Sequence, residues 1–191
     1  MLYPFWLHKS VLPLYCLNIL VVEFFGDHSG RMEVLAAPTV TLPRAANAAG
    51  FSTRALRLAM APPHPFELLG QPGRLARTRN RFAPVDVVRL AIARRLLDFG
   101  LTLAEAQHTL DRSVDNHVSG LIGCGVALPS KFLLDRLDGL FIHIARTGDA
   151  LDVWTDRVGM RVDSPHDTVL TVDGGAVASV ALATLNSRNP A

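Results

Sequence analysis

The sequence contains only two cysteines among its 191 residues. Cys16 and Cys124 lie far apart in unrelated surroundings, and this spacing fits neither a disulfide framework nor a pair of metal ligands. Small secreted domains that depend on disulfide bonds are therefore excluded as a class. The expected location is a reducing compartment, which predicts a cytoplasmic protein.

The sequence also lacks the short motifs that carry most catalytic and cofactor chemistry. There is no P-loop and no dinucleotide fingerprint, and the glycines of GLIGCG at 120–125 follow no predicted strand. Cys124 and His117 lack the spacing of a metal pair, so a small buried thiol is the favoured interpretation over a metal sensor. No nucleophile elbow or oxyanion pattern surrounds Asp115, His117 and Ser119. We therefore expect a protein that is not an enzyme and uses no cofactor or metal.

A hydrophobic run long enough to cross a bilayer is missing as well. The apolar stretch at 11–25 is interrupted by Pro13 and Asn18 and is shorter than the roughly 20 residues that a transmembrane helix needs. It also lacks the basic start and the small-residue cleavage site of a secretory signal. We therefore expect no membrane partner and treat residues 1–40 as an extension of uncertain structure, with Met32 as a hypothetical natural start.

Acidic residues are scarce in one part of the chain. Residues 43–112 hold eleven of the nineteen basic residues but only five of the seventeen acidic ones, a net charge of +6, whereas the remainder carries −4. A basic block beside an acidic remainder is typical of a chain that contacts phosphates, although Arg-rich helices are also common as solvated faces. Charge alone therefore does not decide whether this basic block contacts nucleic acid or is only a solvated surface.

The basic block opens with a helix, a glycine and a second helix start. In TLPRAANAAGF, Thr41 is a candidate N-cap, Pro43 suits the first turn, and Gly50 ends a short alanine-rich helix. Ser52 is a good N-cap for the segment STRALRLAM that follows. This order predicts a helix-turn-helix, because alanines let two helices approach closely and glycine gives the turn its backbone freedom.

The second of these helices is amphipathic. Leu56 and Met60 are four residues apart and are expected to face inward, whereas Arg54 and Arg57 are expected to project from the other side. Such a helix offers its N-terminal side chains and its arginines to a DNA groove. The pattern is moderately specific, since helical hairpins of this kind also occur in unrelated bundles.

A segment rich in proline, glycine and arginine follows. Apolar residues on either side of Gln-Pro-Gly at 71–73 predict a short hairpin, which would be a wing. In an extended arm, most of its arginines would point to one side, toward phosphates or a minor groove. A solvated basic loop is the alternative. The arginines are Arg74, Arg77, Arg79 and Arg81.

Two further helices are predicted after this segment. The stretch PVDVVRLAIARRLLDFG begins with Pro84 at a first turn and stops at Gly100. Thr102 and Glu105 form a capping box before a last short helix. The expected apolar stripe of the longer helix consists of Val88, Ala91, Ile92, Leu96 and Phe99.

These segments together resemble the DNA-binding domain of MerR-type transcriptional regulators. The resemblance rests on A-A-N-A-A-G-F-S-T-R-A-L-R, on a wing segment ending in R-F, and on A-P-V-D-V-V-R-L-A-I-A-R-R-L-L-D-F-G-L-T-L-A-E-A. It implies a winged helix-turn-helix over residues 41–112, with four short helices and a wing hairpin. By this resemblance the recognition helix would carry Ser52, Thr53, Arg54 and Arg57, and the wing would carry Arg79 and Arg81.

The remaining residues, 113–186, predict a small α+β domain, so the fold class is α+β. A short helix is expected at 130–137, and the period then changes toward that of strands. Two strands flank a turn at 147–149, and Asp-Gly-Gly at 173–175 indicates a second hairpin. We therefore expect four antiparallel strands and one helix, followed by a disordered tail at 187–191.

Two functions remain open. The first is a DNA-binding transcriptional regulator that acts as a homodimer on double-stranded DNA, with the C-terminal module for dimerisation or for sensing an unidentified small-molecule effector. The second is a non-regulatory adaptor, or an architectural protein of the excisionase kind, built on the same winged helix fold. The fold alone does not separate them.

Overall fold

The structure is a computed structural model that describes residues 37–63, 65–70, 81–123, 130–148, 150–157 and 168–187. These residues belong to one compact unit that begins at Met32. Most of the predicted extension and all but the first residue of the predicted tail therefore lie outside the described residues.

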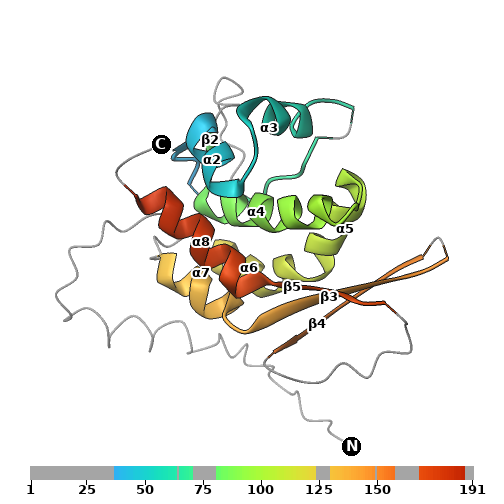
Figure 1. Ribbon diagram of the computed structural model, residues 1–191. Coiled ribbons are helices and arrows are strands. Elements are labelled where there is room, and N and C mark those ends of the chain that lie inside the picture. Colours follow the sequence, from blue (N-terminus) through green and yellow to red (C-terminus); the bar gives the residue numbers. More distant parts are fainter. Residues whose placement is uncertain are drawn as a thin grey trace, which may run out of the picture. The chain divides into compact units, whose positions relative to one another are not determined.

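The first two helices of the described chain are separated by a glycine turn. Helix α2 spans Leu42–Ala49 and helix α3 spans Thr53–Ala59 (Figure 1). Gly50 ends α2 with a left-handed φ of 74°, a conformation that glycine adopts without a steric penalty. The Ser52 hydroxyl accepts a hydrogen bond from the Ala55 amide at 3.1 Å and caps α3. The two predicted helices and the turn between them are confirmed.

Two short strands bring the end of the predicted wing segment back to the start of α2. Strand β1, Val40–Thr41, pairs antiparallel with strand β2, Arg81–Phe82. Arg81 is exposed and Phe82 is buried, as the alternation along a strand requires. The hairpin predicted around residues 71–73 lies outside the described residues and stays a prediction.

Helices α4, Pro84–Asp98, and α5, Leu103–Arg112, follow as predicted. The capping box is confirmed, because the Glu105 amide donates to the Thr102 hydroxyl at 3.2 Å and the Thr102 amide donates to the Glu105 carboxylate at 2.7 Å. The placement of Phe99 in the apolar stripe is wrong. Its side chain is 57% exposed, since α4 has already ended and Phe99 belongs to the turn that follows.

The second half of the described chain contains an antiparallel sheet. Helices α6, Val114–Gly123, and α7, Ser130–Leu137, precede it. Strands β3, Leu140–Thr147, and β4, Ala150–Arg157, form the predicted hairpin. Strand β5, Leu170–Asp173, pairs with the other side of β3, which gives the order β4-β3-β5.

The segment after β5 is a helix, so the prediction of a hairpin at 173–175 is wrong. Helix α8 spans Gly174–Asn186, and the Asp173 carboxylate caps it by accepting a hydrogen bond from the Ala176 amide at 2.8 Å. The predicted four strands and one helix are corrected to three strands and three helices within the described residues after position 113. The segment forms a helix because its buried residues recur at helical spacing. They include Ala178, Ala181, Leu182 and Leu185.

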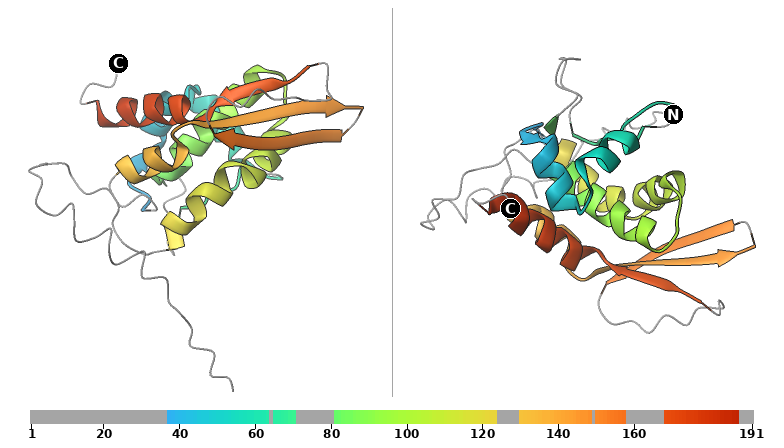
Figure 2. Two further views of the ribbon diagram at one scale, coloured as in Figure 1. Left: turned by 90° about the horizontal axis from the view of Figure 1, so that it is seen from below. Right: turned by 45° about the horizontal axis from the view of Figure 1, so that its top comes forward.

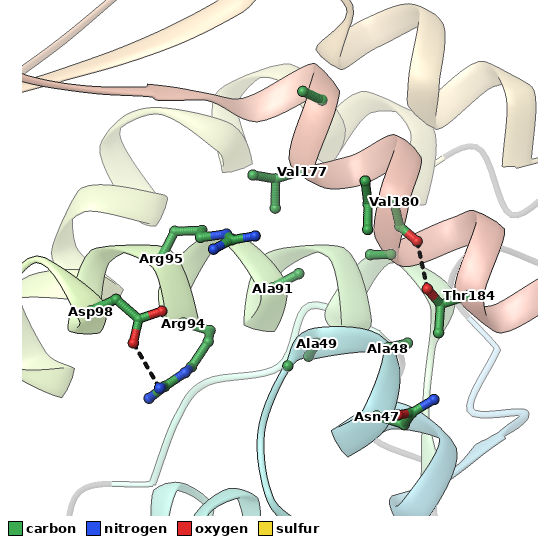
Figure 3. A pocket seen from close by; sticks show the side chains of 13 residues that line it. Asn47, Ala48, Ala49, Ala91, Arg94, Arg95, Asp98, Val177, Val180 and Thr184 are labelled. Carbon is green, nitrogen blue, oxygen red and sulfur yellow. Dashed lines mark hydrogen bonds and ion pairs between the residues drawn. The ribbon is translucent and has the colours of Figure 1, made fainter. Parts of the chain in front are cut away.

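Helix α8 packs across α2 and α4 (Figures 1 and 2). Buried residues of α8 belong to the same hydrophobic cluster as those of α2 and α4. A groove stays open between α8, the end of α2 and α4 (Figure 3). The segments before and after residue 112 therefore share one core. The division into two domains at residue 112 stays a prediction.

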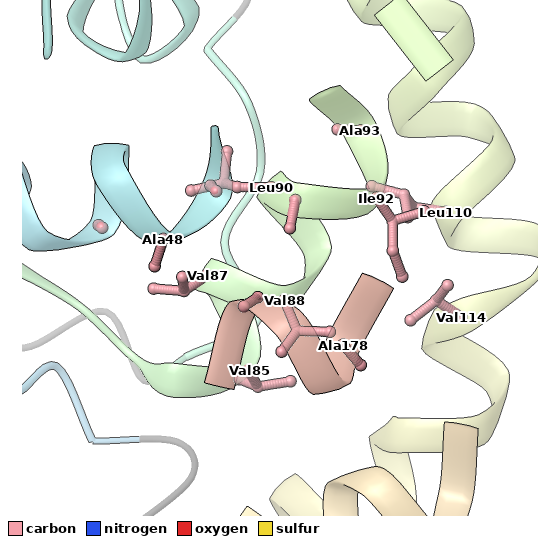
Figure 4. Packing of buried hydrophobic residues seen from close by; sticks show 14 of the residues in the cluster. Ala48, Val85, Val87, Val88, Leu90, Ile92, Ala93, Leu110, Val114 and Ala178 are labelled. Carbon is pink, nitrogen blue, oxygen red and sulfur yellow. The ribbon is translucent and has the colours of Figure 1, made fainter. Parts of the chain in front are cut away.

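Helix α4 is the centre of this core. All of residues 84–93 are buried, which fits a helix that is covered on every side rather than along one stripe. Figure 4 shows Val88 directed toward Ala178 of α8, and Ile92 directed toward Leu110 and Val114. Because α4 contacts α2, α5 and α8, it fixes the position of the elements around it.

Replacing Gly175 by alanine is expected to destabilise the fold. A Cβ at this position would lie 2.7 Å from the carbonyl oxygen of Leu137, so α8 would have to shift at a cost of about 1–3 kcal/mol. Gly120 in α6 is the matched control, because a Cβ there meets nothing within 4 Å and alanine stabilises an exposed helix by about 0.5–1 kcal/mol. Chemical denaturation of both variants measures the difference. Equal midpoints for Gly175→Ala and Gly120→Ala would contradict the close packing of α8.

Candidate DNA-binding surface

Helix α3 has one buried face and one exposed basic face. Leu56 is fully buried and Ala59 is 8% exposed. Arg54, Arg57 and Leu58 are exposed, and their spacing places them on the same side of the helix. The first turn of α3 carries no acidic residue. This face therefore presents two cations to solvent without a carboxylate in the first turn of the helix.

The residues predicted for the recognition helix lie together on α3 and its cap. Ser52 is exposed, and its hydroxyl oxygen already accepts the capping bond from Ala55. Thr53 is half-buried at the first helical position, and Arg54 follows it into solvent. Among the described residues the Ser52 hydroxyl donates to no acceptor, so its hydrogen can serve one on DNA, because a hydroxyl both donates and accepts.

Of the predicted wing arginines, the structure describes Arg81. It is exposed on β2, and its guanidinium donates to the Thr39 carbonyl at 3.4 Å, which is a long and weak hydrogen bond. Arg74, Arg77 and Arg79 lie outside the described residues.

A further arginine, Arg44, holds the end of α8 beside the start of α3. Its guanidinium donates to the carbonyl of Leu185. A cavity of about 410 Å³ at this place is lined on one side by Ser52 and Thr53 and on the other by Ser187. The cation offsets the partial negative charge at the C-terminus of α8. Sequence reasoning could not find this contact, because it assigned a strand where α8 lies.

Asp86 of α4 fastens the two chain segments that lead into and out of the predicted wing. Its carboxylate accepts hydrogen bonds from the Leu69 amide at 2.7 Å and the Gly70 amide at 3.1 Å. It also accepts a long bond from the Ala83 amide at 3.4 Å. Burial raises the pKa of Asp86, while these hydrogen bonds oppose the shift. We call residues 66–70 together with Ala83 the wing base.

Arg89, also on α4, connects the wing base to the helices behind it. Its fully buried guanidinium donates two hydrogen bonds of 2.8 Å to the carboxylate of Asp115 and a longer one of 3.4 Å to Asp111. It also donates to the carbonyl of Glu67 and lies 5.3 Å from the ring centre of Phe66. Burial raises the pKa of Asp115 to about 6, and the nearby Arg89 guanidinium opposes this shift.

Comparison with known families tests the resemblance. Residues 67–113 match the family model described as MerR HTH family regulatory protein. The resemblance to MerR-type regulators is confirmed over this segment. No curated protein and no solved structure matches the chain.

The MerR-type segment begins in the wing base and ends just after α5, so it includes both Asp86 and Arg89. Helices α2 and α3 precede it and are not part of the match. Within this segment, Asp86 and Arg89 connect the wing base to α4, and Arg89 also bonds to Asp111 of α5. Arg89 further bonds to Asp115 of α6, which follows the segment. The match supports a DNA-binding regulator with a helix-turn-helix.

Neither a metal site nor a membrane-spanning helix is found in the described part of the chain. Within these ranges, the His, Cys, Asp and Glu residues form no group of three or more that could hold a metal ion. The helices described there are all too short or too polar to cross a membrane. Cys124 lies outside the described residues.

Proposed function

We propose that this chain is a transcriptional regulator that binds double-stranded DNA through the exposed face of α3 and an arginine-rich wing. Arg54 and Arg57 contact base edges or phosphates in the major groove, and Ser52 and Thr53 stand at the helix end that enters it. Arg74, Arg77, Arg79 and Arg81 contact phosphates or a minor groove. The observation that carries the proposal is the capped helix with an exposed two-arginine face beside a MerR-type segment.

The contacts of Asp86 and Arg89 with the wing base support the same function. A wing can add to an interface only if its base holds a fixed angle to the recognition helix. Asp86 and Arg89 hold the wing base against α4 through buried, charge-assisted hydrogen bonds, which are stronger than neutral ones. The Phe66 amide joins the same base to α3, because it donates to the Ala59 carbonyl at 2.8 Å. A regulator of this kind acts where the DNA is, so we place it in the cytoplasm.

DNA binding is expected to weaken steeply as the salt concentration rises. Each phosphate contact releases a counterion, so replacing Arg81 by glutamine should make the slope of log K against log salt shallower by about one. Fluorescence anisotropy of a labelled duplex measures this slope. Arg112→Gln is the control, since Arg112 is exposed at the end of α5, and it should keep the original slope. Binding that is indifferent to salt would contradict phosphate contact.

The protein is expected to form a homodimer built partly from residues after 113. A single winged helix buries little DNA surface, and regulators of this type gain affinity by binding two half-sites. Multi-angle light scattering of the full chain measures the mass directly. A monomer at micromolar concentration would count against the dimer and against recognition of paired half-sites.

A further inference from the structure

The groove between α8 and the helix-turn-helix has the size of a small-molecule site. Its volume is about 400 Å³, within the range of ordinary ligand pockets, which begins at about 300 Å³. One wall is α8, and the other consists of the end of α2, including Gly50 in the turn, and the second half of α4 (Figure 3).

The α8 wall is apolar. Val177, Val180 and Ala181 line it, and Val180 leaves 63% of its surface exposed. On the opposite side, Ala48 and Ala91 continue the apolar lining. An apolar ligand body laid between these walls would cover Val180 and replace water along both helices, which favours binding.

The α4 side of the groove adds a cation. Arg94 is already engaged, because it pairs with Asp98 at 2.7 Å and lies over the ring of Phe51. Arg95 is different: in the described part of the chain its guanidinium forms no hydrogen bond or ion pair. Figure 3 shows this guanidinium extended toward Val177 of α8. A free, planar cation beside an apolar wall suits a carboxylate, which it can bind with two parallel hydrogen bonds.

We propose that this groove binds a small amphipathic carboxylic acid, with the carboxylate on Arg95 and the hydrocarbon body against Val177 and Val180. The ligand would contact α8 on one side and the turn between α2 and α3 on the other. A bound acid would therefore favour one particular distance between α8 and the helix-turn-helix. This coupling to DNA rests on the proposed function, in which α3 is the recognition helix.

Octanoate and octanamide are the probes that test the site. They share an alkyl chain, and only octanoate carries the negative charge. In calorimetric titrations of the full chain, octanoate is expected to bind saturably with one site per chain. Octanamide is expected to bind about two- to fivefold more weakly, because it loses the ion pair with Arg95, which is exposed and screened by water.

Two variants assign the binding to the groove. Arg95→Gln should reduce octanoate affinity to that of octanamide, whereas Arg112→Gln, the exposed control on α5, should leave the preference intact. Val180→Asp places a negative charge on the apolar wall and should abolish the binding of octanoate. The site is disproved if octanoate shows no saturable binding at millimolar concentration, or if Arg95→Gln still prefers octanoate.

A DNA-binding measurement with and without octanoate tests the coupling separately. A change in DNA affinity that disappears in Arg95→Gln supports it, and an unchanged affinity at saturating octanoate overturns it. If the chain alone binds no DNA, the proposed function fails, while the calorimetric result for the groove still stands.

Discussion

Replacing Arg89 by methionine is expected to lower the free energy of unfolding by about 3–5 kcal/mol. The guanidinium is fully buried and bonded to Asp115, Asp111 and the carbonyl of Glu67. Methionine fills part of the volume but leaves the Asp115 carboxylate, only 14% exposed, without its cation. The wing base also loses its link to α5 and α6. Chemical denaturation followed by circular dichroism measures the loss.

Two further variants distinguish a broken buried pair from a general effect of removing arginine. Arg94→Met breaks an ion pair with Asp98 in which both side chains are 40% exposed, so it should cost no more than about 1 kcal/mol. The double variant Arg89→Met with Asp115→Leu removes both charges and should recover part of the stability lost in the single variant. Equal losses in Arg89→Met and Arg94→Met would contradict the role given to Arg89.

Arg54→Ala is expected to weaken DNA binding, whereas Leu56→Ala is expected to destabilise the fold. Arg54 is exposed, so its loss should leave the melting temperature nearly unchanged and weaken specific DNA binding by about 1–3 kcal/mol. Leu56 is fully buried, so its truncation should cost about 2–5 kcal/mol of stability and reduce DNA binding only as a consequence. Melting curves and binding isotherms of both variants provide the comparison.

The pair of variants also tests the orientation of α3. The wrong face of α3 has been assigned to DNA if Arg54→Ala melts at a clearly lower temperature than the unchanged protein. The same conclusion follows if Leu56→Ala stays folded but does not bind DNA. Arg57→Ala is a useful companion, because Arg57 shares the exposed face with Arg54. It should behave like Arg54→Ala in stability.

The sequence predicted the elements whose ends are set by local chemistry. Ser52, and Thr102 with Glu105, are capping residues whose hydrogen bonds lie within three residues, and the structure contains these bonds. Gly50 and Gly100 stop their helices with φ of 74° and 89°, a backbone conformation that favours glycine over residues with a Cβ. Because these signals act over only a few neighbouring residues, they can be recognised from the sequence alone.

The sequence did not predict α8, because its signals are ambiguous at short range. Asp173 followed by two glycines fits both a hairpin turn and a helix N-cap. The choice is made by Ala178, Ala181 and Leu182, which are buried against helices far away in the chain. Arg44 and the groove were missed for the same reason, since both depend on where α8 packs.

Arg89 was also missed as a structural residue, although the sequence held a signal. It stands in VVRLAIA, within a helix whose neighbours are apolar on every side. A charged residue in such a helix is expected to be buried and paired. Its partners could not be named, because Asp115 and Phe66 lie more than twenty residues away on either side and meet it only in the fold.

The most direct test of DNA recognition is an electrophoretic mobility shift assay with the full chain on the DNA upstream of its own gene. A regulator should give a shifted complex that survives an excess of random duplex and that needs a higher protein concentration in Arg54→Ala. If random duplex removes the complex as readily as the upstream DNA does, the protein is an architectural binder. If no complex forms at low salt, the chain is an adaptor and the proposed function is wrong.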